Sequence, residues 1–356
     1  MMHSNGLTQA AVELSADQRR QLVDVRQVYE AWRTRHDDFG HRFAGSVRWV
    51  TRRGHEYLHR KISDKERSLG RRSPQTELTY NAFLTGRAQA KEQLQRLARR
   101  LDEMAPVNRA LQLGRVPRLF ARVLRRLDDH GLLGTHLLVV GTHALFAYEA
   151  AAGVQVRAGL LATTDADLLW DARQRLTLVL PEARRDGVLG LLQRVDRSFQ
   201  LRNPHDFRAS NADGFWIDLI RPQDRSFLSP SARSTLGDNP ADLHAAPVHG
   251  LHWLLNVPKC EVVTVGEDGY PLRLVTLDAR AFALHKRWLA QRKDRDPVKA
   301  GRDLEQAAVA AFLCQRYLAQ RFDDAALQGL PLALRELAGE LAQVPAEPDD
   351  RLEPQW

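Results

Sequence analysis

The stretch Val139–Asp171 of this chain reads VVGTHALFAYEAAAGVQVRAGLLATTDADLLWD. It starts inside a short apolar run, residues 136–141, of the kind that is buried in the middle of a sheet. Gly141-Thr142 ends that run, and the alanine-rich segment up to Ala152 predicts a helix. The stretch closes on Asp165–Trp170, a second predicted strand. Together these segments predict a strand, a glycine turn, a helix and a strand that carries carboxylates.

Three aspartates fall on predicted strands. Asp165 and Asp167 are two positions apart, so they share one side of the sheet. Asp218 lies in the apolar run FWIDLI (residues 215–220), which follows an Asp213-Gly214 turn and so predicts the second strand of a hairpin. A carboxylate in an apolar strand needs a reason, because burying it unpaired is costly.

A glycine turn and three carboxylates are the set that nucleotidyl transfer needs. Two divalent cations, Mg²⁺ or Mn²⁺, bridge the carboxylates, one holding the triphosphate and one activating the attacking hydroxyl. Gly141 lets the backbone approach the phosphates. The Thr142 hydroxyl and the helix N-terminus behind it can bind the β,γ oxygens.

The alternative is a structural role for the same residues. In that case Asp165 caps a turn, Asp167 faces solvent, and Asp218 pairs with an arginine. Arg202 and Arg208 are the candidate partners.

Other chemistries find no support in the motifs. The chain has no HExxH pair, which argues against zinc. It has no GxSxG elbow, no GxxxxGK[ST] loop and no GxGxxG before a helix. We expect His143, directly after the turn, to face solvent or to cap, with a local polar contact as the alternative.

These motifs resemble the polymerase-β-like nucleotidyltransferase superfamily, and within it a poorly characterised bacterial family named only for its nucleotidyltransferase fold. The resemblance covers most of residues 45–320 and includes the segments GHEYLHR, SLGRRSPQTE, LGRVP and ALHKRWLAQRKDRDPVKAGRD. It implies an α+β or α/β fold, with a mixed sheet flanked by helices. It also implies binding of ATP or another NTP, with Mg²⁺ or Mn²⁺ as cofactor. The phosphate-binding and metal-binding positions of the superfamily fall on Gly141, Thr142, Asp165, Asp167 and Asp218, the last of which would also polarise the acceptor hydroxyl.

Basic residues gather near the end of a later helix. They are His285, Lys286, Arg292, Lys293 and Arg295. A lysine followed by a basic loop and Asp-Pro resembles the nucleotidyltransferase toxins of abortive-infection systems, and it predicts Lys286 as a point-charge contact for the triphosphate. The equal alternative is that these charges coat an exposed helix face. Asp303 is expected to pair with Arg302 or Lys299, without a role of its own.

Charge divides the chain unevenly. Residues 1–134 hold 26 Lys and Arg against 15 Asp and Glu, whereas the remainder holds 26 against 29. A basic front half predicts an anionic partner there, and RNA is a candidate; an arginine-rich helical composition is the plain alternative. No signal peptide or membrane span is expected, and the two cysteines are predicted to be buried thiols, which suits a reducing cytoplasm.

The predicted organisation follows from these patterns and from turn signals. In the front region we expect a helix from Ser15, a hairpin over residues 47–59, a loop over 68–77 and a helix over 76–104. The hairpin arginines are expected to form a solvated face, with an anion site as the alternative, and Arg71 and Arg72 to be exposed rather than to grip a phosphate. The predicted regions are 1–15 disordered, 16–134 basic and helical with the hairpin, 135–225 nucleotidyltransferase core, 226–276 loop and second hairpin, 277–345 C-terminal helical domain with helices over 278–291, 297–318 and 324–341, and 346–356 disordered.

The sequence therefore predicts a Mg²⁺-dependent enzyme that moves a nucleoside monophosphate from an NTP onto an RNA, protein or small-molecule acceptor. The second hypothesis is a protein of the same fold that binds nucleotide or nucleic acid without turnover. The third is a toxin component that modifies tRNA or a protein. Retention of a glycine turn with three aspartates favours the first.

Overall fold

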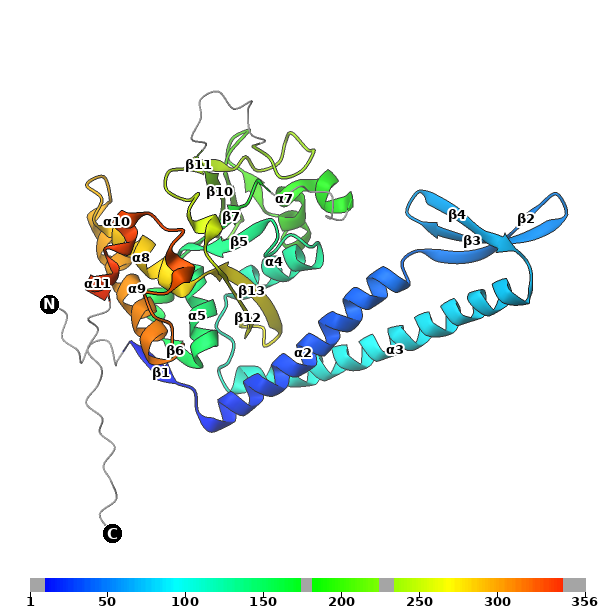
Figure 1. The fold of residues 1–356 in the computed structure, drawn as a ribbon, viewed down its shortest axis with the longest axis horizontal. Helices are drawn as coiled ribbons and strands as arrows, with labels where there is room; N and C mark the ends of the chain where they lie inside the picture. The colour runs from blue at the N-terminus through cyan, green and yellow to red at the C-terminus, as the bar shows by residue number, and fades with distance from the viewer. Residues whose placement is uncertain (1–9, 174–180, 224–233, 342–356) are drawn as a thin grey trace, which may run out of the picture. The chain divides into compact units, whose positions relative to one another are not determined.

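The computed structural model describes residues 10–173, 181–223 and 234–341 (Figure 1). The chain forms two compact units. The front unit consists of residues 20–113 and 269–271, and the rear unit contains the other described residues. Within the described ranges, no helix is both long enough and apolar enough to cross a membrane.

The front unit has two long helices and a small antiparallel sheet between them in the chain. Helix α2 (Ala16–Arg42) precedes the sheet and α3 (Pro74–Ala110) follows it. The sheet has the order β2-β3-β4, with strands β2 (Ser46–Arg52), β3 (His55–Ile62) and β4 (Lys65–Arg71). The predicted helices and hairpin are confirmed, and a third strand is added to the hairpin.

Local capping explains where the two long helices start. Ser15 accepts a hydrogen bond from the backbone N–H of Gln18, whose side chain binds back to Ser15 N–H. Ser73 and Thr76 form the same reciprocal capping box at α3, with Pro74 in the first turn. These side chains satisfy N–H groups that have no partner within the helix.

Two front-region predictions are wrong in part. The expected loop over residues 68–77 begins instead as β4, which pairs with β3 after a turn in which Ser63 has a φ of +49°. The expected disorder over residues 1–15 is wrong for β1 (Ala11–Glu13), because this strand pairs with β6 (Val154–Val156) of the rear unit. Residues 1–9 lie outside the described part of the chain.

A mixed sheet forms the centre of the rear unit, and this confirms the predicted fold class. Its strand order is β5-β7-β10-β9-β8, and β11 also pairs with β10. Strands β7 and β10 are parallel, while β5 is antiparallel to β7 and β9 is antiparallel to β10. The strand bounds are β5 (Leu137–Val140), β7 (Asp165–Trp170), β8 (Gln200–Leu201), β9 (Arg208–Ser210), β10 (Trp216–Pro222) and β11 (Ala246–Val248).

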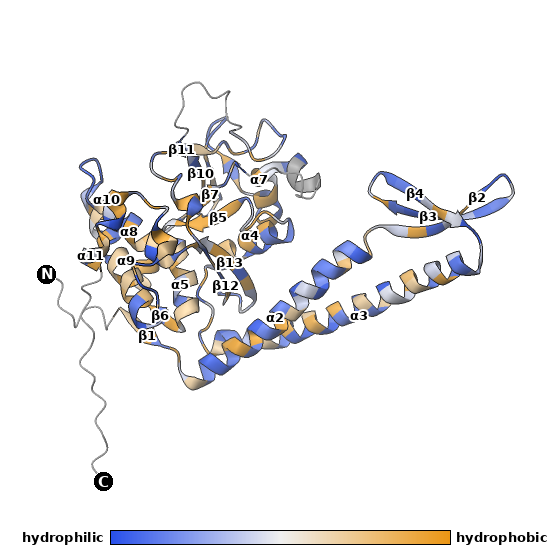
Figure 2. Cartoon of the chain, viewed as in Figure 1, coloured by the Kyte–Doolittle hydropathy of each residue, from blue (hydrophilic) through white to orange (hydrophobic). Residues whose placement is uncertain are grey.

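Helices precede, interrupt and follow the strands of this sheet along the chain. All four residues of β5 are buried, and Figure 2 shows β5 and α5 coloured as hydrophobic. The second hairpin is confirmed as β12 (Lys259–Val265) and β13 (Pro271–Leu277). The helices are α4 (Arg118–Asp129), η1 (Gly141–Ala144), α5 (Leu145–Ala152), α6 (Ala158–Leu161), α7 (Pro181–Val195), η3 (Leu254–Asn256), α8 (Ala279–Ala290), α9 (Pro297–Arg316), η4 (Ala325–Leu327), α10 (Leu332–Arg335) and α11 (Ala338–Leu341).

The last predicted helix is wrong as a continuous element. Residues 324–341 form three short helices, η4, α10 and α11. Pro331 has no N–H for a helix bond and stands at the start of α10, which explains the interruption. The predicted disordered tail, residues 346–356, lies outside the described residues. Both cysteines are free thiols, Cys314 buried and Cys260 partly buried.

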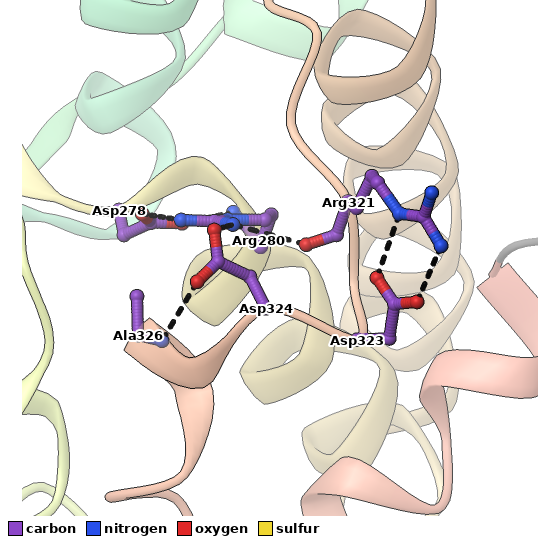
Figure 3. Close-up of polar contacts among 6 residues, drawn as sticks. All are labelled: Asp278, Arg280, Arg321, Asp323, Asp324 and Ala326. Carbon is purple, nitrogen blue, oxygen red and sulfur yellow. Dashed lines mark hydrogen bonds and ion pairs between the residues drawn. The ribbon is translucent and has the colours of Figure 1, made fainter.

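A buried ion pair fixes the start of α8 (Figure 3). The carboxylate of Asp278 caps the helix at the N–H of Arg280 and binds its guanidinium at 2.9 and 2.7 Å. The same guanidinium donates to Asp324 at 3.0 Å and to the carbonyl of Arg321 at 2.9 Å. The side chains of Arg280 and Asp278 are only 6% and 5% exposed. This network holds α8, the helix that carries Lys286, against the segment before η4.

We predict that Arg280→Met lowers the free energy of unfolding by about 3 kcal/mol, because it leaves the buried Asp278 carboxylate without its cation. Urea unfolding of the full chain measures this. Arg321→Met is the matched control: its pair with Asp323 is 80% and 65% exposed, so the midpoint should stay the same. Similar losses in both variants would contradict the assignment.

Candidate active site

Gly141 lies directly against the carboxylate of Asp167. Strand β5 ends at Val140, whose register partner in β7 is Asp167. Gly141 follows with a φ of +67°, and a Cβ atom at this position would lie 2.2 Å from Asp167 Oδ2. Both the left-handed backbone and the close approach therefore require glycine at the turn.

The three predicted aspartates come together at this turn. Asp167 and Asp218 are register partners in the parallel pair β7–β10, and Asp165 is two residues earlier on the same strand. Burial first, and then the charges of Asp165 and Asp218, together raise the pKa of Asp167 to about 6. The site thus holds more negative charge than its neighbours neutralise, and the roles of these residues as metal ligands stay predictions.

Arg208 occupies both carboxylate oxygens of Asp218. It lies opposite Asp218 in the β9–β10 pair and binds it through Nε at 2.7 Å and Nη2 at 2.5 Å. Its guanidinium carbon also lies 4.3 Å from the ring centroid of Trp216. The hydrogen bonds to Asp218 raise the pKa of Arg208. This is the arginine pairing that the sequence offered as the structural alternative for Asp218.

The carboxylates of Asp165, Asp167 and Asp218 are suitable ligands for a divalent cation, but they are not arranged to coordinate one. Carboxylate oxygens are the ligands that Mg²⁺ prefers, and the raised pKa of Asp167 reflects charge that a cation would neutralise. Among the described residues, however, no group of three His, Cys, Asp or Glu side chains is placed to hold a metal. Asp218 is engaged by Arg208, and an oxygen of Asp165 accepts from the Thr163 hydroxyl.

Lys286 is buried in an ion-pair network between α8 and α9. Its ammonium nitrogen lies 2.7 Å from Asp303 Oδ1, and Arg295 binds the other oxygen of Asp303. Burial lowers the pKa of Lys286, while Asp303 and Asp167 oppose that shift. The alternative of an exposed helix face is wrong for Lys286, which is 8% exposed. The predicted pairing of Asp303 with Arg302 or Lys299 is also wrong.

Helix α9 supplies polar contacts to the turn that were not predicted. The Thr142 hydroxyl accepts from the side-chain amide of Gln306 at 3.2 Å and from Arg302 Nη2 at 3.4 Å. The buried Nε of Arg302 has no hydrogen-bond partner. Arg302 therefore lies beside the glycine turn with a donor that has no partner. No local sequence signal links it to Thr142, which is 160 positions away.

The sequence predicted that His143 faces solvent or caps a helix, and this prediction is wrong. It is 1% exposed and lies among aromatic rings, with its centroid 4.4 Å from Phe120 and 5.7 Å from Phe146. Burial lowers its pKa to about 4, so the ring is neutral near pH 7. It packs beneath the turn rather than offering a charge to a ligand.

The glycine turn thus lies beside the three aspartates, with Lys286 buried nearby and Arg208 and Arg302 half-buried. The chain belongs to the nucleotidyltransferase family, because a family model described as Nucleotidyltransferase matches residues 118–330, more than half of its length. This membership supports a nucleotidyl transfer function and agrees with the mixed-sheet fold. No curated protein and no solved structure matches the chain.

We predict that Asp167→Asn stabilises the metal-free protein at neutral pH. The folded-state pKa of Asp167 lies above that of an unfolded aspartate, so its ionisation lowers the free energy of unfolding as pH rises from about 4 to 6. The variant lacks this loss and should be more stable by about 2 kcal/mol at pH 8 and no more stable at pH 3.5.

Chemical unfolding in EDTA at several pH values measures the difference. The exposed Asp213 provides the control, since Asp213→Asn should leave the pH dependence unchanged. A loss of stability at pH 8 in Asp167→Asn would contradict the electrostatic account.

Proposed function

We propose that the protein is a Mg²⁺- or Mn²⁺-dependent nucleotidyltransferase. It moves a nucleoside monophosphate from an NTP to a hydroxyl or phosphate acceptor: the acceptor oxygen bonds to the α-phosphorus, and the bond to pyrophosphate breaks. The observation that carries the proposal is the gathering of Asp165, Asp167 and Asp218 at the left-handed Gly141.

In this proposal the three aspartates hold the divalent cations, which would neutralise the triphosphate and activate the acceptor hydroxyl. Asp218 also orients the acceptor. Gly141 and Thr142 lie where phosphate oxygens approach, and the free Nε of Arg302 is a donor for them.

Lys286 acts at longer range. Its ammonium group is held by Asp303 and interacts electrostatically with Asp167, so it contributes positive potential to the site rather than a free side chain. A triphosphate contact by Lys286 would require it to leave Asp303.

One observation favours a second candidate, a non-catalytic nucleotide-binding protein. The two-point contact of Arg208 with Asp218 already neutralises the third carboxylate, as a purely structural residue would require. The two candidates differ in whether Arg208 gives up Asp218 when a cation binds.

The transfer experiment incubates the full chain with each α-labelled NTP, Mg²⁺ or Mn²⁺, and cellular RNA, protein or small-molecule fractions. We expect label in one acceptor class, and a loss of about hundredfold or more in Asp165→Asn/Asp167→Asn, because the cation ligands are gone. Asp213→Asn should transfer at the wild-type rate. The proposal would be refuted if the double variant transferred label at the wild-type rate. It would also be refuted if no protein transferred label and the double variant bound NTP as tightly as the wild type.

A metal titration separates the two candidates. Arg208→Gln removes the competing cation from Asp218 and should bind Mn²⁺ roughly tenfold more tightly than the wild type, the worth of one charge-assisted contact. Arg202→Gln, an exposed arginine nearby, should leave the affinity unchanged. Equal Mn²⁺ affinity in all three proteins would favour the non-catalytic candidate.

A further inference from the structure

The positive charge of the chain resides in the front unit. Residues 20–113 carry 20 Lys and Arg against 11 Asp and Glu, a net charge of +9, whereas the whole chain has +8. Within this unit the sheet and its turns, residues 46–71, hold eight basic residues against three acidic ones. The sheet is therefore the most strongly positive structural element that the mechanism leaves without a use.

One face of this sheet is committed to packing. The Trp49 ring lies 5.7 Å from the ring of Tyr80 on α3, and the Arg60 guanidinium lies 5.5 Å from the ring of Phe83 on the same helix. Leu58, the register partner of Trp49, is fully buried. Because side chains alternate along a strand, the residues between these point to the opposite, outer face.

The outer face combines rings with cations. Tyr57 of the central strand pairs in register with Val50 on β2 and with Arg71 on β4. Tyr57 is partly exposed, and among the described residues its hydroxyl makes no hydrogen bond and its ring stacks on no other ring. His55, which is exposed, accepts a hydrogen bond at Nδ1 from Arg71 Nη2 at 2.8 Å. Arg52 lies opposite His55 in β2.

Most of the cations on this sheet have no acidic partner. Arg48 pairs with Glu66, which leaves a set of exposed basic side chains without an ion pair in the described part of the chain. That set is Arg52, Arg53, Lys61, Lys65, Arg67 and Arg71. By register, Lys61 lies on the outer face with Arg52 and Arg71, whereas Lys65 and Arg67 pair with Ile62 and Arg60 of the packed face. Unneutralised cations on one face repel one another, and an anionic partner relieves that repulsion.

A depression of about 390 Å³ opens at the end of the sheet, between His55 and Arg71 and the start of α3. Its acidic residues Glu56 and Glu77 are already neutralised by Arg72, which binds both. Arg71 remains as a cation without an acid, so the depression favours an anionic group.

We propose that the outer face of the β2-β3-β4 sheet binds single-stranded nucleic acid. The cations would contact the phosphates, and the rings of Tyr57 and His55 would stack on unpaired bases. A duplex hides its base faces and would leave those rings unused. A lipid surface would require exposed apolar side chains, whereas Val50, the apolar register partner of Tyr57, is only partly exposed.

The further proposal that this face binds the acceptor rests on the proposed function, and it makes nucleic acid the acceptor class. Binding itself needs neither cation nor NTP, so the two proposals fail separately. Asp165→Asn/Asp167→Asn should lose transfer and keep wild-type binding of an oligonucleotide.

The test is fluorescence anisotropy of a labelled 16-nucleotide RNA of mixed sequence with the full chain in EDTA, at several salt concentrations. Arg52→Gln/Arg71→Gln should weaken binding by tenfold or more and lower the slope of log K against log salt by about 1.4, since each phosphate contact of a single strand contributes about 0.7. Arg96→Gln/Arg99→Gln, two exposed positions on α3, removes the same charge and should change affinity less than threefold.

Tyr57→Leu tests stacking separately from charge. It should weaken binding by at least fivefold with the salt slope unchanged, because base stacking contributes without releasing counterions. The same oligonucleotide as DNA should bind as well, and a stronger RNA complex would assign the surface to RNA. Equal losses in both arginine pairs, no effect of Tyr57→Leu, preference for duplex, or binding only to phosphatidylserine vesicles would each overturn the proposal.

Discussion

The close approach of the Asp167 carboxylate to the backbone of Gly141 is the constraint on which the site depends. A Cβ atom at residue 141 would overlap Oδ2 of Asp167, so the turn and the carboxylate strand specify each other. This contact joins the end of β5 to β7, and the parallel register of β7 with β10 places Asp167 beside Asp218. A half-buried carboxylate next to two others is unfavourable for folding unless a cation neutralises it. A cationic ligand would supply that charge.

Arginine and lysine neutralise this cluster in different ways. Arg208 binds Asp218 directly, and Lys286 contributes through space while bound to Asp303. A partially neutralised cluster remains foldable without a ligand and still attracts a metal–triphosphate complex. The Arg208–Asp218 pair does not distinguish a functional site from a structural one, because both need Asp218 to be neutralised. The rest of the cluster distinguishes them, since Asp167 keeps a raised pKa in spite of Arg208.

Local patterns predicted the elements of the site, and long-range pairing was less accessible. The apolar strand over 137–140, the helix caps and the strand with alternating aspartates follow from residue type and spacing. The tight turn before β10 also sets the hairpin register, so the pairing of Arg208 with Asp218 was deducible and was offered as one of two arginine partners. The Lys286–Asp303 pair was missed because it depends on how two helices pack. Interruption of the C-terminal helix was deducible from its proline.

The most direct test of the account is anomalous diffraction from crystals of the full chain grown with MnCl₂ and a non-hydrolysable NTP analogue. The account predicts manganese density at about 2.0–2.3 Å from carboxylate oxygens of Asp165, Asp167 and Asp218, with the guanidinium of Arg208 withdrawn from Asp218. Density for the analogue without manganese at these carboxylates, and with Arg208 still bound to Asp218, would contradict it.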